Sequence, residues 1–94
     1  MSIDPLSIGL SGLVAYGEVI GTSANNVANV GTSAFKPKSV TLHEVTPAGV
    51  AVATTSTSPT PGTVLSDEFV KMIAAQKAYE ANTKTIDESK PPSP

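Results

Sequence analysis

Apolar and small residues in the first third of the chain recur at alternating steps of four and three residues. The stripe consists of Leu6, Leu10, Leu13, Gly17, Ile20, Ala24 and Val27. This spacing is that of a coiled-coil seam, where one face of an α-helix packs against a partner helix. Asp4 and Pro5 form a strong start signal, with Asp4 as N-cap and Ile3 placed to pack on Ile8. We predict an N-terminal helix within residues 1–31 that begins at Pro5.

A second stripe with the same spacing lies near the C-terminus. It consists of Leu65, Phe69, Met72, Gln76, Tyr79, Thr83 and Ile86. Either Thr63 or Ser66 can cap the start of this helix, and the helix must end by about Lys90 because the prolines that follow cannot continue it. We therefore predict a C-terminal helix over residues 63–90 that pairs with the first helix as a coiled coil, followed by a disordered tail at residues 91–94.

The middle of the chain has the composition of β-strands and a loop. Residues 39–46 (SVTLHEVT) and 49–54 (GVAVAT) are rich in β-branched side chains, and the Pro47-Ala48-Gly49 break between them favours a hairpin. The stretch TTSTSPTPG at residues 54–62 has no apolar anchor and is typical of an extended linker or a mobile loop. Residues 32–62 are thus predicted as a β-hairpin and a Pro/Ser/Thr-rich loop. The expected fold class is mainly α with a small β part.

The faces opposite the two stripes carry few charges. Between Pro5 and Phe35 the only charged residue is Glu18, whereas a solvated amphipathic helix normally has a charged face. In the second helix, small residues that would let another backbone approach closely form one face: Ala74, Ala75, Ala78 and Ala81. Each glycine in the first helix costs about 1 kcal/mol relative to alanine. We therefore expect both helices to be covered by partners, and to be largely disordered in the isolated monomer.

The first helix ends in the sequence NNVANV at residues 25–30. Asparagine is a poor helix former because its side chain competes for backbone hydrogen bonds. In one interpretation Asn25, Asn26 and Asn29 are interface residues that fix register and neighbour identity, with Asn26 pointing to a different neighbour from the other two. In the other interpretation this is a frayed last turn with Asn and Gly as caps. The spacing is compatible with both.

The composition excludes several classes of function. There is no cysteine and a single histidine, His43, so neither a thiolate site nor a pair of imidazoles is available, and we expect no metal and no cofactor. All six basic residues are lysines and the net charge is −2, which argues against nucleic-acid binding. Asp4, Glu18 and the glycines of the first apolar run argue against a cleaved signal peptide and against direct membrane insertion.

Two runs of sequence carry a resemblance to a known family. Leu10 to Lys36 (LSGLVAYGEVIGTSANNVANVGTSAFK) resembles the N-terminal end of bacterial flagellar rod and hook proteins, where a small-residue helix ends in ANN-x-AN, a Thr and then Gly-Phe-Lys. Leu65 to Asp87 (LSDEFVKMIAAQKAYEANTKTID) resembles the E-F-V-x-M-I-x-A-Q-x-A-Y-x-A-N helix at the C-terminal end of that family. The two runs cover about half of the chain, in the family's order.

The resemblance implies a structural subunit of the flagellar basal body rod, with paired terminal helices lining the inner tube and β structure outside them. It also implies self-assembly, contacts with other rod and hook proteins, and a location in the periplasmic part of the basal body. The chain would reach this location through the flagellar type III export apparatus, unfolded and without a cleaved signal peptide.

Matching positions carry the family motifs over to Asn25, Asn26, Asn29, Phe35 and Lys36, and to Glu68, Phe69, Met72, Gln76, Tyr79, Ala81 and Asn82. Together with the stripes, these motifs give a set of candidate interface residues. The set is Leu6, Leu10, Leu13, Ile20, Asn25, Asn26, Val27, Asn29, Phe35, Lys36, Phe69, Met72, Gln76, Tyr79, Asn82 and Ile86.

Three features depart from the family pattern. Ala34 stands where the family usually has Gly before Phe-Lys, so we expect the backbone there to fall short of the usual left-handed turn. The second helix ends in ESKPPSP at residues 88–94, where the family continues through an apolar tail, so the last turns of inner-tube packing are expected to be missing. The segment at residues 37–64 is too short for a large outer domain of the hook type.

An enzyme is not expected. Ser11 lacks the spacing of a nucleophile elbow, and His43 and Glu44 would lie on opposite faces of a strand. The alternative to a rod subunit is a soluble rod-like paralogue that acts as an adaptor or regulatory binding protein. The short apolar C-terminus favours the adaptor, and the uncharged outer faces favour polymerisation.

Overall fold

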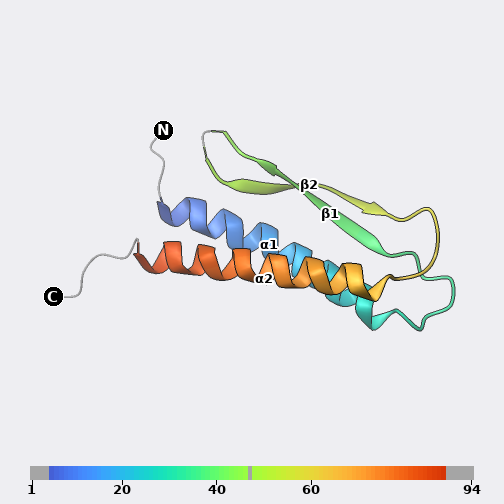
Figure 1. Cartoon of the computed structure of the whole chain (residues 1–94). Helices are drawn as coiled ribbons and strands as arrows, with labels where there is room; N and C mark the ends of the chain where they lie inside the picture. The colour runs from blue at the N-terminus through green and yellow to red at the C-terminus, as the bar shows by residue number, and fades with distance from the viewer. Residues whose placement is uncertain (1–4, 47, 89–94) are drawn as a thin grey trace.

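Two long helices and a β-hairpin make up the computed structural model, which describes residues 5–46 and 48–88. In chain order the elements are α1 (Pro5–Ala28), β1 (Lys38–Glu44), β2 (Val50–Thr57) and α2 (Leu65–Glu88). The helices run antiparallel, side by side, and the hairpin lies along α1 (Figure 1). Within the described residues, α2 packs on α1 and not on the strands. The fold is mainly helical with a small β part, as predicted.

The helix ends agree only in part with the sequence signals. α1 begins at the predicted Pro5, while the cap and staple predicted at Asp4 and Ile3 lie outside the described residues. α2 begins at Leu65, so neither Thr63 nor Ser66 is its N-cap. The Thr63 hydroxyl donates instead to a carbonyl of α1, because the turn into α2 passes close to the end of that helix. The tail predicted to be disordered at residues 91–94 lies outside the described residues.

The hairpin is longer than its sequence signals indicated. β1 pairs antiparallel with β2 from Lys38↔Thr57 to Glu44↔Val50, with an irregularity between Thr41 and Leu42. Residues 54–57, predicted as part of a loop, are strand, because β-branched threonines suit the pleated backbone and β1 extends far enough to pair with them.

The rest of the predicted loop is held by backbone hydrogen bonds. The Ser58 N–H donates to the Pro37 carbonyl at 2.8 Å, and the Gly62 N–H donates to the Phe35 carbonyl at 2.9 Å. Residues 58–62 therefore follow the segment that leads into β1, and they form a loop outside the helices and strands.

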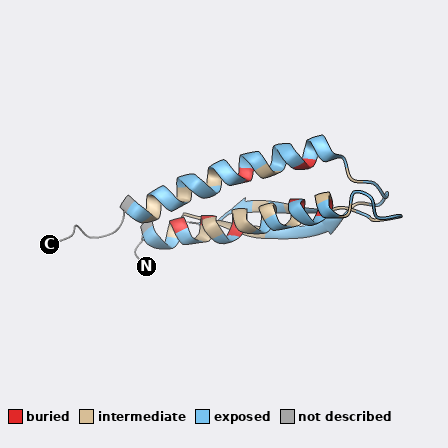
Figure 2. Ribbon diagram, turned by 90° about the horizontal axis from the view of Figure 1, so that it is seen from below, coloured by how far each residue is buried: buried red, intermediate tan, exposed pale blue. Residues whose placement is uncertain are grey.

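The apolar core is very small. Among the described residues, the fully buried hydrophobic side chains are Ala15 and Ala75, and the buried polar ones are Ser23, Asn26 and Glu68. Figure 2 shows these few buried positions along helices that are otherwise half-buried or exposed. Burial of apolar surface thus contributes less to this fold than is usual for a domain of this length.

The two helices meet through their small residues. A Cβ on Gly9 would lie 2.7 Å from Ile86, and a Cβ on Gly12 would overlap with the Asn82 side chain. The absence of side chains at these glycines lets α2 approach closely and insert Asn82 and Ile86. Ala75, on the small-residue face of α2, is also buried in this chain.

The predicted intrachain seam is therefore wrong at several positions. Leu6, Leu10, Phe69 and Gln76 are exposed, so the contact between α1 and α2 does not run along the stripes to which they belong. Glycine and alanine permit a closer approach of the backbones than leucine and phenylalanine do, and the helices pack on that flatter side.

Candidate assembly surface

The N-terminal half of α1 exposes a row of apolar side chains. Leu6, Leu10 and Val14 follow one another at one-turn spacing and are 41%, 48% and 70% exposed. Residues four apart share a helix face, so these side chains form one exposed row beside the predicted stripe. Further along the same side of the helix, Gly17 is half-buried and Gly21 exposed, which leaves the second half of the stripe almost flat.

The N-terminal half of α2 exposes a second apolar patch. Its most exposed members are Val70 at 66% and Ile73 at 56%, and Leu65 and Phe69 flank them. Because α1 and α2 are antiparallel, the patch on α2 and the stripe on α1 lie toward opposite ends of the elongated molecule (Figure 1). Monomeric proteins rarely leave contiguous apolar surface of this kind uncovered.

The two predicted stripes lie side by side instead of facing each other. A Cβ on Gly17 would lie 3.9 Å from the ring of Tyr79, so the stripe of α1 meets that of α2 at this point. Leu13, Gly17 and Tyr79 also line one shared shallow depression. The exposed part of both stripes therefore forms one two-helix face that is open to another molecule.

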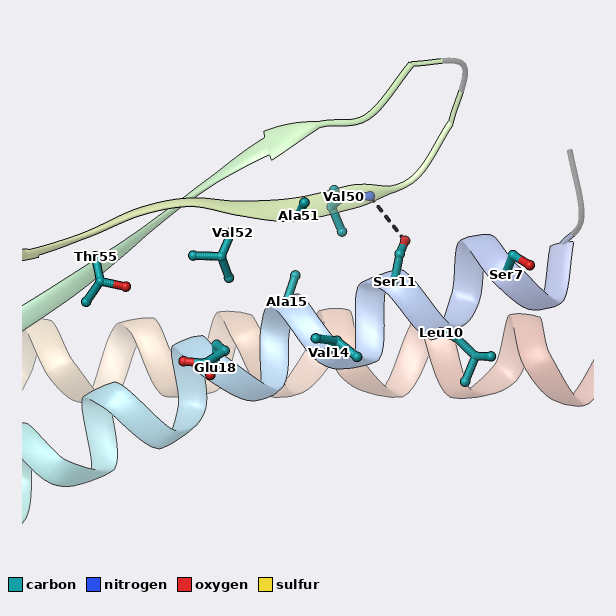
Figure 3. A pocket seen from close by; sticks show the side chains of 10 residues that line it. All are labelled: Ser7, Leu10, Ser11, Val14, Ala15, Glu18, Val50, Ala51, Val52 and Thr55. Carbon is teal, nitrogen blue, oxygen red and sulfur yellow. Dashed lines mark hydrogen bonds between the residues drawn. The ribbon is translucent and has the colours of Figure 1, made fainter. Parts of the chain in front are cut away.

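A groove runs between α1 and β2 on the hairpin side of this face (Figure 3). Glu18 is the charged residue of its lining, which consists of Ser7, Leu10, Ser11, Val14, Ala15, Glu18, Val50, Ala51, Val52 and Thr55. Ser11 bridges the two walls: its hydroxyl donates to the Ile8 carbonyl at 2.7 Å and accepts from the Val50 N–H at 3.2 Å. Ser11 is thus part of the scaffold, and the groove is an apolar surface without a nucleophile–base pair.

Asn26 is the most buried large side chain of the described residues, with no exposed surface. Its Nδ2 donates to the Lys38 carbonyl at 2.7 Å and to Glu68 Oε1 at 3.0 Å, and its Oδ1 accepts from the Lys38 N–H at 2.9 Å. The amide therefore pairs with both backbone groups of Lys38, as a neighbouring strand would. Asn26 joins the end of α1, the start of β1 and the first turn of α2.

Two further groups complete this polar junction. The Thr63 hydroxyl donates to the Asn26 carbonyl at 3.0 Å, and Lys71 lies 3.5 Å from Glu68 Oε2. Glu68 is 4% exposed, so its carboxylate is buried with one oxygen bound by an amide and the other beside an ammonium group. No buried side-chain polar atom among the described residues is left without a hydrogen bond.

The other two asparagines of NNVANV have different roles. Asn29 Nδ2 donates to the Asn25 carbonyl at 2.9 Å, and Asn29 Oδ1 accepts from the Thr32 hydroxyl at 3.1 Å. Asn29 therefore caps the end of α1, while Asn25 is exposed. Asn29 thus acts as a cap, as in the second interpretation, whereas the partners of Asn26 belong to the same chain, and a contact of these asparagines with neighbouring copies stays a prediction.

The segment after α1 corrects the expectation for Ala34. Ala34 has φ of 61°, so its backbone does adopt the left-handed conformation. The hydrogen bonds from the Phe35 N–H to the Thr32 carbonyl and from the Gly62 N–H to the Phe35 carbonyl hold this turn in place. The surrounding contacts thus impose a conformation that alanine adopts at some cost. Phe35 is half-buried and Lys36 is exposed.

The remaining candidate residues fall into two groups. Asn25, Gln76 and Tyr79 are exposed with the apolar stripes, and half-buried positions lie between the helices or at their edges: Leu13, Ile20, Val27, Met72, Asn82 and Ile86. Sequence reasoning missed Lys38, Thr63 and Glu68 as the partners of Asn26. The sequence did contain a signal for the face of α2 that packs on α1. Residues at helical spacing share this face: Glu68, Met72, Ala75, Asn82 and Ile86.

The described residues offer no metal centre and no membrane span. No group of three or more His, Asp or Glu residues is placed to hold a metal ion in the parts of the chain that the structure describes. Neither described helix is long and apolar enough to cross a membrane. His43 lies exposed on β1 beside Ala51 of β2.

A comparison with known proteins found a family similarity in the region of the C-terminal helix. Residues 62–90 match the family model described as flagellar basal body rod FlgEFG protein C-terminal. This segment contains all of α2, including Glu68, the apolar patch and Asn82. A search of curated proteins found no match.

Proposed function

Since residues 62–90 identify the chain as a member of the flagellar rod and hook family, we propose that it is a structural subunit of the basal body rod that self-assembles through its terminal helices. Family membership supports a structural, non-enzymatic role in the flagellum. The observation that carries self-assembly is the two-helix face, where Leu10 and Phe69 are exposed without a covering element.

The spacing of this face suits helices from other copies. Leu6, Leu10, Leu13 and Gly17 keep the four-three spacing of a coiled coil, and so do Phe69, Met72, Gln76 and Tyr79. Because Leu10, Phe69 and Gln76 of these stripes stay exposed within the chain, we propose that the stripes form coiled-coil seams between copies, or with other rod and hook proteins. The candidate interface residues at exposed positions are then the ones that contact neighbours.

The small core supports a coupling of order to assembly. Ala15 and Ala75 supply little apolar burial, so we propose that the free chain is largely disordered and becomes helical on assembly. Such a chain would also suit passage through the flagellar type III export apparatus in an unfolded state. Amide exchange on the dilute chain tests this proposal, because strong protection across residues 6–28 without a partner would contradict it.

The decisive experiment is mass spectrometry of purified hook–basal bodies after a wash that removes loosely bound proteins. Recovery of this chain in a fixed ratio to known rod proteins is the expected result. If the chain is absent from the particles and found soluble in the cell, the rod assignment is wrong and the adaptor or regulatory paralogue takes its place.

A pair of variants links this result to the surface. Ile73→Asp places a charge within the exposed patch and is expected to remove the chain from the particles, because a buried, unpaired carboxylate is costly. Lys84→Asp, on an exposed position of the same helix outside the patch, is the control and is expected to be recovered at the wild-type level. Equal recovery of the two variants would place the assembly contact elsewhere on the chain.

A further inference from the structure

The hairpin is fastened to α1 at its two ends by different side chains. At the closed end, Ser11 Oγ accepts from the Val50 N–H at 3.2 Å. At the open end, Asn26 Oδ1 accepts from the Lys38 N–H at 2.9 Å. In both cases a strand N–H donates to a side-chain oxygen of α1, so the exchange protection of the two amides can be compared directly.

Only one of these two fastenings also involves α2. Asn26 Nδ2 divides its two hydrogens between the Lys38 carbonyl and Glu68 Oε1, whereas Ser11 Oγ bonds to the Ile8 carbonyl and the Val50 N–H. Glu68 lies in the first turn of α2 and is nearly fully buried. The carboxylate accepts hydrogen bonds only, so it dictates that the nitrogen of the Asn26 amide, and not its oxygen, faces α2.

The orientation of the amide matters for β1. With Nδ2 directed to Glu68, the second Nδ2 hydrogen reaches the Lys38 carbonyl and Oδ1 reaches the Lys38 N–H. A reversed amide would place its oxygen against the Lys38 carbonyl and its nitrogen against the Lys38 N–H, so neither hydrogen bond could form. Glu68 and the two backbone groups of Lys38 therefore require the same orientation of the Asn26 amide, so the first turn of α2 reinforces the pairing at the open end of the hairpin.

We infer that Asn26 is a latch that couples the docking of α2 to the pairing of the hairpin at Lys38. α2 and the strands do not pack on each other, so this coupling passes through a polar side chain and not through a shared apolar core. By thermodynamic reciprocity, a partner that displaces the first turn of α2 loosens the open end of the hairpin, and a partner that orders this end favours α2 docking. The inference does not depend on the proposed assembly.

The test is amide hydrogen exchange on the full chain with Glu68→Leu, in buffer with trimethylamine N-oxide to favour the compact state. We expect exchange of the Lys38 amide to accelerate by about tenfold, because the Asn26 side chain loses one of the three hydrogen bonds that hold it in place. The Val50 amide should change by less than about threefold, since its acceptor Ser11 has no bond to α2. Equal acceleration at Lys38 and Val50, or no acceleration at Lys38, would overturn the latch.

Two matched variants separate the latch from general effects. Glu68→Gln keeps an acceptor oxygen without the charge and should retain most of the protection at Lys38. Asp67→Leu makes the same change at the exposed neighbouring position and should leave both amides as in the wild type. A loss at Lys38 in Asp67→Leu equal to that in Glu68→Leu would show that helix charge, and not the bond to Asn26, is responsible.

A measurement on the wild type covers the case in which Glu68→Leu does not fold. As the osmolyte concentration is lowered stepwise, the amides of Lys38 and of Met72 in α2 should lose protection in the same step. Loss at Lys38 while Met72 stays protected, or the reverse, would show that the two elements open independently and would refute the coupling.

Discussion

The polar junction around Asn26 and the apolar stripes of the two helices invert the usual arrangement of a small protein. At the junction, Asn26 and Glu68 are buried and fully hydrogen-bonded. On and beside the stripes, Leu10 and Phe69 are nearly half exposed, and Val14 and Ile73 more than half. The chain thus buries a hydrogen-bonded polar cluster and leaves several large apolar side chains exposed.

The difference shows how one short chain can separate the determinants of its own fold from those of its partners. Hydrogen bonds are directional, so the junction specifies which segments of the chain meet. Apolar burial is non-directional and grows with area, so the stripes can stabilise contact with any complementary helix. In the free chain the apolar stripes stay in contact with water, which is unfavourable.

The largest expected effect comes from Asn26→Asp, which keeps the shape of the side chain. It replaces the donor Nδ2 with an acceptor oxygen. This oxygen would face two other acceptors, Glu68 Oε1 and the Lys38 carbonyl, in a buried site. We expect a loss of about 3 kcal/mol or more in the free energy of unfolding, measured by circular dichroism in trimethylamine N-oxide. Asn25→Asp, at the exposed neighbouring position, should stay close to wild type. Similar losses for both variants would mean that the buried junction contributes no more to the free energy of unfolding than an exposed position does.

The next effect tests the contact between the helices. Gly12→Ala adds a methyl group that overlaps with Asn82, and we expect a net loss of about 1–3 kcal/mol. Gly21→Ala is the matched control, because no atom lies within 4 Å of a Cβ there, and it should gain up to about 1 kcal/mol from helix propensity. A gain in both variants, measured by thermal unfolding in trimethylamine N-oxide, would place α2 farther from α1.

Phe69→Ala separates fold from assembly. Phe69 is 47% exposed in the single chain, so its truncation should lower the free energy of unfolding of the monomer by only about 1 kcal/mol. Incorporation into basal bodies should fall much more strongly, because the proposed interface would bury the rest of the ring. A monomer loss of several kcal/mol in urea titrations run in trimethylamine N-oxide would contradict the exposed position of this side chain.

The smallest expected effect is a gain. Ala34→Gly removes the steric cost of a Cβ at φ of 61°, and the greater entropy of glycine in the unfolded chain offsets part of the benefit. We expect stabilisation by less than about 1 kcal/mol in the same unfolding assay. Ala81→Gly, at an exposed helical position, should instead destabilise by about 1 kcal/mol, and an equal loss in both variants would argue against the left-handed turn.

Local signals in the sequence are sufficient for the elements themselves. Pro5 marks the start of α1, and the β-branched run around Val40 and Val52 gives a hairpin. The extension of β2 to Thr57 was not predictable in this way, because it depends on pairing with Lys38 of another strand. The left-handed turn at Ala34 was missed for a similar reason, since one of the two hydrogen bonds that hold it comes from Gly62, which is distant in sequence.

The choice of helix face is the point where the sequence pattern alone was insufficient. Spacing establishes that Leu10 shares a stripe with Gly17, and Phe69 with Tyr79, and it gives the asparagines of NNVANV two possible roles. Only the tertiary structure decides that the helices meet at Gly12 and Ala75, and that Asn26 is the asparagine held inside. Periodicity describes one helix at a time, whereas the packed face depends on how closely two backbones can approach and on which buried polar groups find partners.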